Sequence, residues 1–270
     1  MVQNALELLA QVASPEEGAL SRHEVPGTGR HISVWLPASY RREKDRRFPV
    51  LYFVDGDVLT SREGPGPAAD AWAFSLSRQG LLPESILVAI DSGAGHNAEG
   101  QSLRDLELSL ENGGPAFLSF LVQSLIPFVD GLLRTLPAPE SRTLVGAGLG
   151  GLISLAGILR YPEEFGRSVG LSTSFEDLSQ SLPVNAGLLT EIDNASTLPP
   201  DLRAVLYYGS HGLDECYAPY HQDLAGLLRA KGWVEERQFI IRQDPDGTHG
   251  PLSWRKQLGT ALLSSCQLRP

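Results

Sequence analysis

The sequence predicts an α/β fold, with a mainly parallel sheet and helices on both of its faces. Strand-like and helix-like patterns alternate along the chain to its end, which is typical of sheets built from crossover units. Residues 48–54 are continuously apolar and rich in strand-forming residues, as expected for a central strand covered on both faces, and residues 85–90 form the next expected buried strand. A third observation is the order strand, glycine turn, helix over residues 142–160.

The elements follow from hydrophobic periodicity and from turn residues, taken in chain order. We expect one α/β domain over residues 1–270, because 270 residues with 42% hydrophobic content can bury a large core. A polar, irregular stretch at 175–200 is expected to form a small cap-like insertion over the sheet. The strands are expected at 19–25, 31–36, 48–54, 85–90, 143–145, 169–172, 204–208 and 238–242, and the helices at 3–12, 70–78, 117–133, 151–160, 217–230 and 254–264.

Composition excludes several classes of function. The formal charge of −10 argues against a nucleic-acid or anionic-membrane partner, and the basic run at 41–47 is interrupted by acids, as in a solvated loop. No stretch approaches ~18 consecutive apolar residues, and the start lacks the basic region of a signal peptide. Cys216 and Cys266 provide neither a disulfide framework nor a metal-binding spacing. We therefore expect a cytoplasmic protein without metal or other cofactor.

The glycine turn at 146–150 has the form of a nucleophile elbow. In that motif, Gly-x-Ser-x-Gly lies between a strand and a helix, and the flanking glycines allow a bend that exposes the serine hydroxyl. This chain has Gly146 and Gly150 at the flanks, but Gly148 stands where the serine belongs. The sequence therefore predicts the scaffold of a hydrolase without the nucleophile.

Several blocks resemble the putative-esterase family of α/β hydrolases, which includes esterase D, feruloyl esterases and enterobactin-type siderophore esterases. The elbow block at 142–151, with Tyr-Pro-Glu-Glu-Phe-Gly at 161–166, is similar to that of the family. Residues 48–57 resemble its first oxyanion strand, residues 117–130 its helix before the elbow, and residues 247–255 its histidine block. The resemblance covers about residues 30–260 and implies an α/β-hydrolase fold and a serine-esterase mechanism.

The resemblance also suggests the remaining catalytic residues. The order in α/β hydrolases is nucleophile, acid, base, and position 148 is followed by Asp214 and then His249. His249 is expected to be the base. Asp214 is the expected acid, with Glu215 as the reserve; the alternative is that both acids only cap the next helix.

The oxyanion hole needs two backbone N–H groups directed at the developing charge. Leu149, next to the nucleophile position, is expected to supply one, and Asp57 or Gly56 the other. Arg104 matches an arginine that the family often carries, and either binds an anionic or carbonyl group of the substrate or forms a surface ion pair.

Gly148 leaves three explanations open. The serine has been replaced to trap a complex, or a natural relative has lost hydrolysis and binds a ligand, or water or a substrate group fills the space while His249 acts as general base. Ser154, Ser172, Ser174 and Cys216 are not expected to replace the serine. We expect a carboxylic-ester hydrolase scaffold for a small-molecule acyl or lactone ester that lacks its nucleophile; the alternative is a non-catalytic pseudo-hydrolase that binds a ligand or partner.

Overall fold

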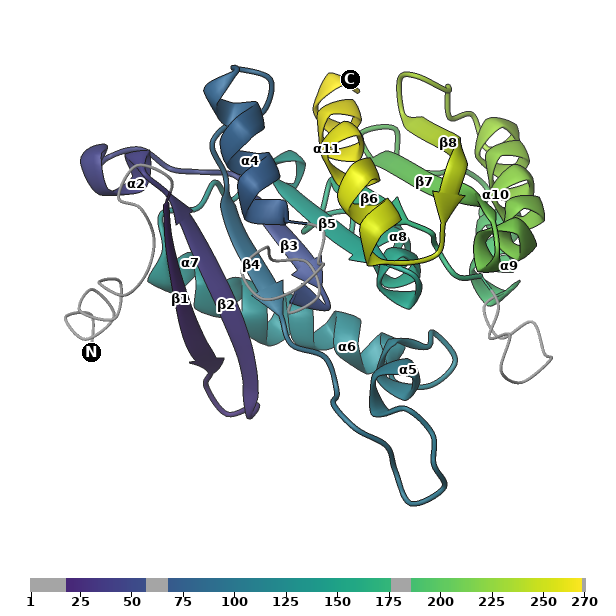
Figure 1. Ribbon diagram of the computed structural model, residues 1–270, viewed down its shortest axis with the longest axis horizontal. Coiled ribbons are helices and arrows are strands. Elements are labelled where there is room, and N and C mark those ends of the chain that lie inside the picture. The colour runs from purple at the N-terminus through teal and green to yellow at the C-terminus, as the bar shows by residue number, and fades with distance from the viewer. Residues whose placement is uncertain (1–17, 57–67, 176–185, 269–270) are drawn as a thin grey trace.

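The computed structural model describes residues 18–56, 68–175 and 186–268. Eight strands form one sheet in the order β1-β2-β4-β3-β5-β6-β7-β8, shown in Figure 1. The strands are β1 Gly18–Val25, β2 Arg30–Pro37, β3 Val50–Val54, β4 Ile86–Ile90, β5 Arg142–Ala147, β6 Arg167–Leu171, β7 Arg203–His211 and β8 Phe239–Thr248.

The sheet is parallel from β4 to β8, and β1 and β2 form an antiparallel hairpin at one edge. Every residue of β3, β4 and β5 is buried, which explains why β3 and β4 are continuously apolar rather than alternating. Because parallel strands end at the same edge of a sheet, the turns after β3, β5, β6, β7 and β8 gather along one side. The predicted α/β fold class is confirmed.

Helices cover both faces of the sheet. The first face carries α4 Ala69–Arg78 and α11 Pro251–Gln267, which lie side by side in Figure 1. The second face carries α8 Leu149–Arg160, α9 Ala186–Asn194, α10 Leu213–Ala230 and the long helix before β5. Residues of these helices share one core. The shorter helices are α2 Ser39–Arg42, α5 Leu103–Leu108 and the 3-10 turn η2 Pro139–Ser141.

The long amphipathic helix before β5 is continuous but not regular. It consists of α6 Gly114–Phe120, the π-helical turn η1 Leu121–Leu125 and α7 Ile126–Leu132. The π turn ends two residues before Pro127, which has no N–H to donate to the preceding turn. With a mean hydropathy of 1.4, this helix is long and apolar enough to cross a membrane on those two criteria alone. In the fold, the apolar residues of this helix pack into the core on the second face of the sheet.

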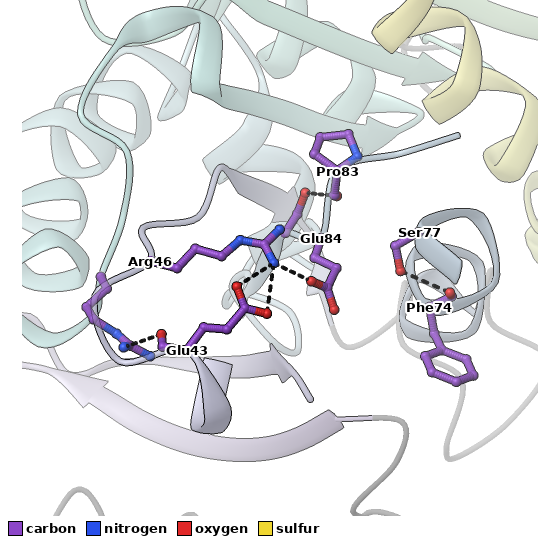
Figure 2. Close-up of polar contacts among 8 residues, drawn as sticks. Glu43, Arg46, Phe74, Ser77, Pro83 and Glu84 are labelled. Atoms are coloured by element: carbon purple, nitrogen blue, oxygen red, sulfur yellow. Dashed lines mark hydrogen bonds and ion pairs between the residues drawn. The ribbon is translucent and has the colours of Figure 1, made fainter. Parts of the chain in front are cut away.

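Arginines of the basic run at 41–47 pair with acidic side chains and with a backbone carbonyl. Figure 2 shows Arg46 between two acidic side chains, with its Nη1 2.7 Å from Glu84 Oε2 and 3.2 Å from Glu43 Oε2. The Arg46 guanidinium also lies over the ring of Phe48, 4.7 Å from its centroid. Arg47 donates to the carbonyl of Thr135.

The structure describes part of the expected cap and none of the first expected helix. The helix expected at 3–12 lies outside the described residues. Within the stretch expected to form a cap, 175–200, the structure has a regular helix, α9, whose buried Leu188 and Ile192 pack into the core. The contacts of α9 are mainly with α10. Whether 175–200 acts as a cap stays a prediction.

Candidate active site

The elbow lies between β5 and α8. Gly148 has φ 58° and ψ −123°, a backbone conformation that residues with a Cβ rarely adopt. Its N–H donates to the carbonyl of Leu171 on β6, and its carbonyl accepts from Gly151 and Leu152 of α8. The chain therefore reverses from strand to helix at the glycine itself, which is the geometry of a nucleophile elbow.

Asp214 and His249 meet beside this turn, although 35 positions separate them in the chain. Asp214 lies in the first turn of α10 and is completely buried, and His249 lies in the turn between β8 and α11. The His249 Nδ1 is 2.9 Å from Asp214 Oδ1. Glu215, the reserve acid, is exposed. The arrangement gives Asp214 the position of a carboxylate that orients the base.

The Asp214 carboxylate is held in its ionised form. Burial would raise its pKa, but hydrogen bonds from His249, from the Ser172 hydroxyl and from the Gly209 N–H outweigh burial and lower the pKa below its ordinary value. Since a carboxylate only accepts hydrogen bonds, the neutral His249 ring donates from Nδ1, and Nε2 keeps the lone pair that a general base needs.

Ser172 and Trp254 complete the support of the acid, and sequence reasoning did not assign them a role. The Ser172 hydroxyl donates to Asp214 Oδ2 at 2.7 Å and accepts from the Trp254 indole at 2.9 Å. Ser172 also has a positive φ of 47°, uncommon for a residue with a side chain. The Trp254 ring in turn packs edge-on against His249, with centroids 5.2 Å apart. No local sequence pattern marks this connection, because Ser172 follows β6 while Asp214 and Trp254 lie in α10 and α11.

The His249 ring lies beside Gly148, where the sequence motif would have a serine. A Cβ built on Gly148 would lie 3.8 Å from His249 Nε2 and 3.4 Å from the Ser174 hydroxyl, so a Cβ would make ordinary van der Waals contacts there. Ser174 was not expected to take part in the site. The structure places its hydroxyl at the centre, because the turn after β6 passes over Gly148.

The residues expected to surround the oxyanion are only partly described. Leu149 begins α8, so its N–H has no acceptor within the helix and is available at the turn. Gly56 closely approaches β4, since a Cβ there would lie 2.1 Å from that of Ala89. Asp57 lies outside the described residues.

Arg104 forms an ion pair with Asp55 at the end of β3. Its Nε donates to Asp55 Oδ2 at 2.8 Å, its Nη2 contacts the same oxygen, and its Nη1 pairs with Asp105 at 3.0 Å. Asp55 is buried and lies 3.5 Å from the point where a Cβ of Gly150 would be. Arg104 thus pairs with a buried carboxylate beside the elbow as well as with the exposed Asp105. Binding of substrate by Arg104 stays a prediction.

Across the described ranges, no group of three or more His, Cys, Asp or Glu side chains is placed to hold a metal ion. The site therefore offers acid–base groups and backbone donors.

Comparison with known proteins places residues 24–225 in the family described as putative esterase. The uncharacterized protein YbbA of Bacillus subtilis (strain 168) is 28% identical over 258 residues, covering 91% of this chain and 95% of that protein. Ferric enterobactin esterase from Salmonella typhimurium superposes with a TM-score of 0.71 at 22% identity, over 97% of this chain and 60% of the esterase. The ferulic acid esterase AmCE1/Fae1A from Anaeromyces mucronatus gives 0.65 at 17% identity, over 97% and 94% of the two chains. This chain thus spans 60% of the length of the enterobactin esterase.

Proposed function

Because this chain belongs to the putative esterase family and has the α/β-hydrolase-like fold of its structural neighbours, we propose that it hydrolyses a small acyl ester or lactone, with His249 activating a water molecule. One observation carries the proposal. The His249 ring is oriented by Asp214 at 2.9 Å, while its Nε2 lies 3.8 Å from the point where the first side-chain atom of residue 148 would be. The proposed base and its carboxylate partner thus lie beside the elbow residue, Gly148.

The chemistry needs no covalent intermediate. His249 Nε2 takes a proton from water as the water oxygen bonds to the ester carbonyl carbon. The N–H of Leu149 is the donor proposed for the oxyanion that forms. When the carbonyl re-forms, the bond to the leaving oxygen breaks and that oxygen receives the proton from His249. Asp214 stays ionised and stabilises the imidazolium between the two transfers.

The substrate class is proposed from the family and from the structural neighbours. The family model and the neighbours named enterobactin esterase and ferulic acid esterase support an ester, and among esters we propose an acyl ester or lactone. We expect slow turnover. A triad enzyme that loses one member commonly keeps only ~10³ to 10⁴-fold catalysis over water.

The test is hydrolysis of p-nitrophenyl acetate and of a short lactone by the purified chain and by two variants. We expect His249→Ala to lower kcat/KM about 100-fold or more, the range for loss of a general base, and Asp214→Asn to lower it as well. His96→Ala is the matched control, because His96 is an exposed loop histidine and any imidazole can attack an activated ester. Equal activity of His249→Ala and the unaltered chain would refute the proposal.

A second candidate function is ligand binding without turnover, and Gly148 itself favours it, because a glycine cannot form an acyl-enzyme. In that case the chain would bind an ester or its acid product with measurable affinity while hydrolysis stayed at the rate of the His249→Ala variant. Calorimetric titration of the same esters into both proteins separates the two functions.

A further inference from the structure

We propose that Ser174 holds the attacking water against His249, a role that rests on the proposed general-base hydrolysis. Ser174 lies in the turn after β6, and this turn is fixed over the elbow because the Ser174 N–H donates to the Gly148 carbonyl at 3.1 Å. The Ser174 Oγ is 3.4 Å from the point that a Cβ of residue 148 would take. The backbone therefore positions this hydroxyl at the centre of the site.

The three hydroxyls of this turn have different surroundings. Ser172 is used in supporting Asp214. Thr173 points into the close packing of β6 on α8, 2.5 Å and 2.7 Å from the Cβ positions of Gly170 and Gly151. Among the described residues, the buried hydroxyl of this turn that lacks a hydrogen-bond partner is that of Thr173. Ser174 is 6% exposed, and its hydroxyl is not among the buried groups without a partner. The Ser174 Oγ instead faces Gly148.

Two polar side chains face the same small space. The Ser174 Oγ and the His249 Nε2 are 3.4 and 3.8 Å from the position that a Cβ of residue 148 would take. A bound water needs two to four polar partners, at about 2.8 Å each. A water oxygen at this Cβ position would need to move by only about 1 Å to reach hydrogen-bond distance of either side chain. The absence of a side chain on Gly148 makes room for that oxygen.

The contacts of His249 favour a water over direct attack by Ser174. A general base lies about 2.6–3.2 Å from the oxygen that it deprotonates. Within the described ranges, the hydrogen bond of the His249 side chain is the one to Asp214, and none joins it to Ser174. A water between the two groups closes this gap. It donates one proton to His249 Nε2, its second hydrogen stays on the new carboxyl group, and Ser174 neither gains nor loses a bond to carbon.

The test compares Ser174→Ala with Ser154→Ala, using p-nitrophenyl acetate as the probe. Ser154 is an equally buried serine, but its hydroxyl donates to the Gly150 carbonyl within α8, away from the reacting groups. We expect Ser174→Ala to lower kcat about 10 to 100-fold while KM changes less than about two-fold, because the water is misplaced and the ester contacts are kept. Ser154→Ala should retain kcat.

Gly148→Ala provides a second variant, because its methyl group occupies the space assigned to the water. Thermal unfolding identifies whether this variant is folded, and the folded protein should be at least as impaired as Ser174→Ala. Unchanged kcat in Ser174→Ala, with activity lost in His249→Ala, would overturn the role of Ser174 and leave the proposed function intact. Labelling of Ser174 by a fluorophosphonate would also overturn it, because Ser174 would then be a nucleophile. Equal rates in the unaltered chain and in His249→Ala would overturn both proposals.

Discussion

Gly148 differs from the elbow serine of a serine esterase by one methylene and one hydroxyl, while its backbone has the conformation of the elbow. Glycine reaches φ 58° and ψ −123° without the steric cost that a side chain brings. A serine in this conformation is strained by about 1 to 3 kcal/mol, which a packed fold can sustain. At the residue scale, the chemistry of the site is therefore decided by two atoms on one residue.

Gly148→Ser should create a covalent serine esterase. The Cβ of the new serine would lie 3.8 Å from His249 Nε2, so that its Oγ can reach the base. We expect the variant to become labelled by a fluorophosphonate probe at residue 148 and to form an acyl-enzyme with p-nitrophenyl esters, read out as a burst of nitrophenol.

The double variant Gly148→Ser with His249→Ala is the control, because it keeps the hydroxyl but removes the base. It should give neither label nor burst. If Gly148→Ser is folded but unlabelled, the dyad and the oxyanion donors are not in working geometry, and the ligand-binding function becomes the better account.

Between elements, the elbow depends on a very close approach of β5 to α8. A Cβ on Gly146 would lie 2.2 Å from the carbonyl carbon and oxygen of Gly150, and both atoms belong to the backbone. No rotamer change relieves such a contact, so the strand and the helix would have to separate. The flanking glycine that the sequence motif requires is thus a condition on packing between two elements.

Gly146→Ala should lower the free energy of unfolding by about 1 to 3 kcal/mol, the usual cost of overpacking. It should also impair the site, because α8 carries Leu149. The matched control is Gly131→Ala on the exposed side of α7, where a Cβ meets nothing within 4 Å. There, alanine should stabilise by about 0.5 to 1 kcal/mol through its helix propensity. Urea unfolding of both variants checks the prediction, and a neutral Gly146→Ala would contradict it.

For the whole molecule, a buried histidine makes stability depend on pH. His221 of α10 is completely buried, stacks on Tyr208 of β7 and meets the edge of Phe175, which follows β6. Burial lowers its pKa from 6.5 to about 4. The folded chain holds His221 neutral while the unfolded chain protonates it below pH 6.5. Its share of stability is therefore complete above pH 6.5 and is lost as the pH falls towards 4.

The loss should amount to up to about 3 kcal/mol between pH 6.5 and 4, the free energy equivalent of the change in pKa. His221→Asn removes the titration and keeps a donor for the Tyr217 carbonyl, which His221 Nδ1 contacts at 2.9 Å. Urea unfolding at several pH values should show a shallower decrease for His221→Asn than for the unaltered chain. His96→Asn, at an exposed position, is the control, and equal slopes for all three proteins would contradict the prediction.

The sequence by itself determined the elements whose patterns depend on residues close to one another in the chain. Continuous apolar runs placed β3 and β4, because strands covered on both faces need no polar side. The glycines of 146–150 placed the elbow, since only glycine fits both its backbone conformation and its close packing. The order of Asp214 and His249 after the elbow then predicted that the two would meet, and the structure has them in contact.

The tertiary structure alone decided which side chains share the site. Ser172 and Ser174 lie in one short turn, yet one supports the acid and the other faces Gly148, because a positive φ at Ser172 changes the direction of the chain. Arg104 is paired with Asp55 across 49 positions. Such contacts depend on the register of parallel strands and on the packing of helices over them. These are set by the burial of the whole core, so no local pattern around Ser174 or Arg104 could reveal them.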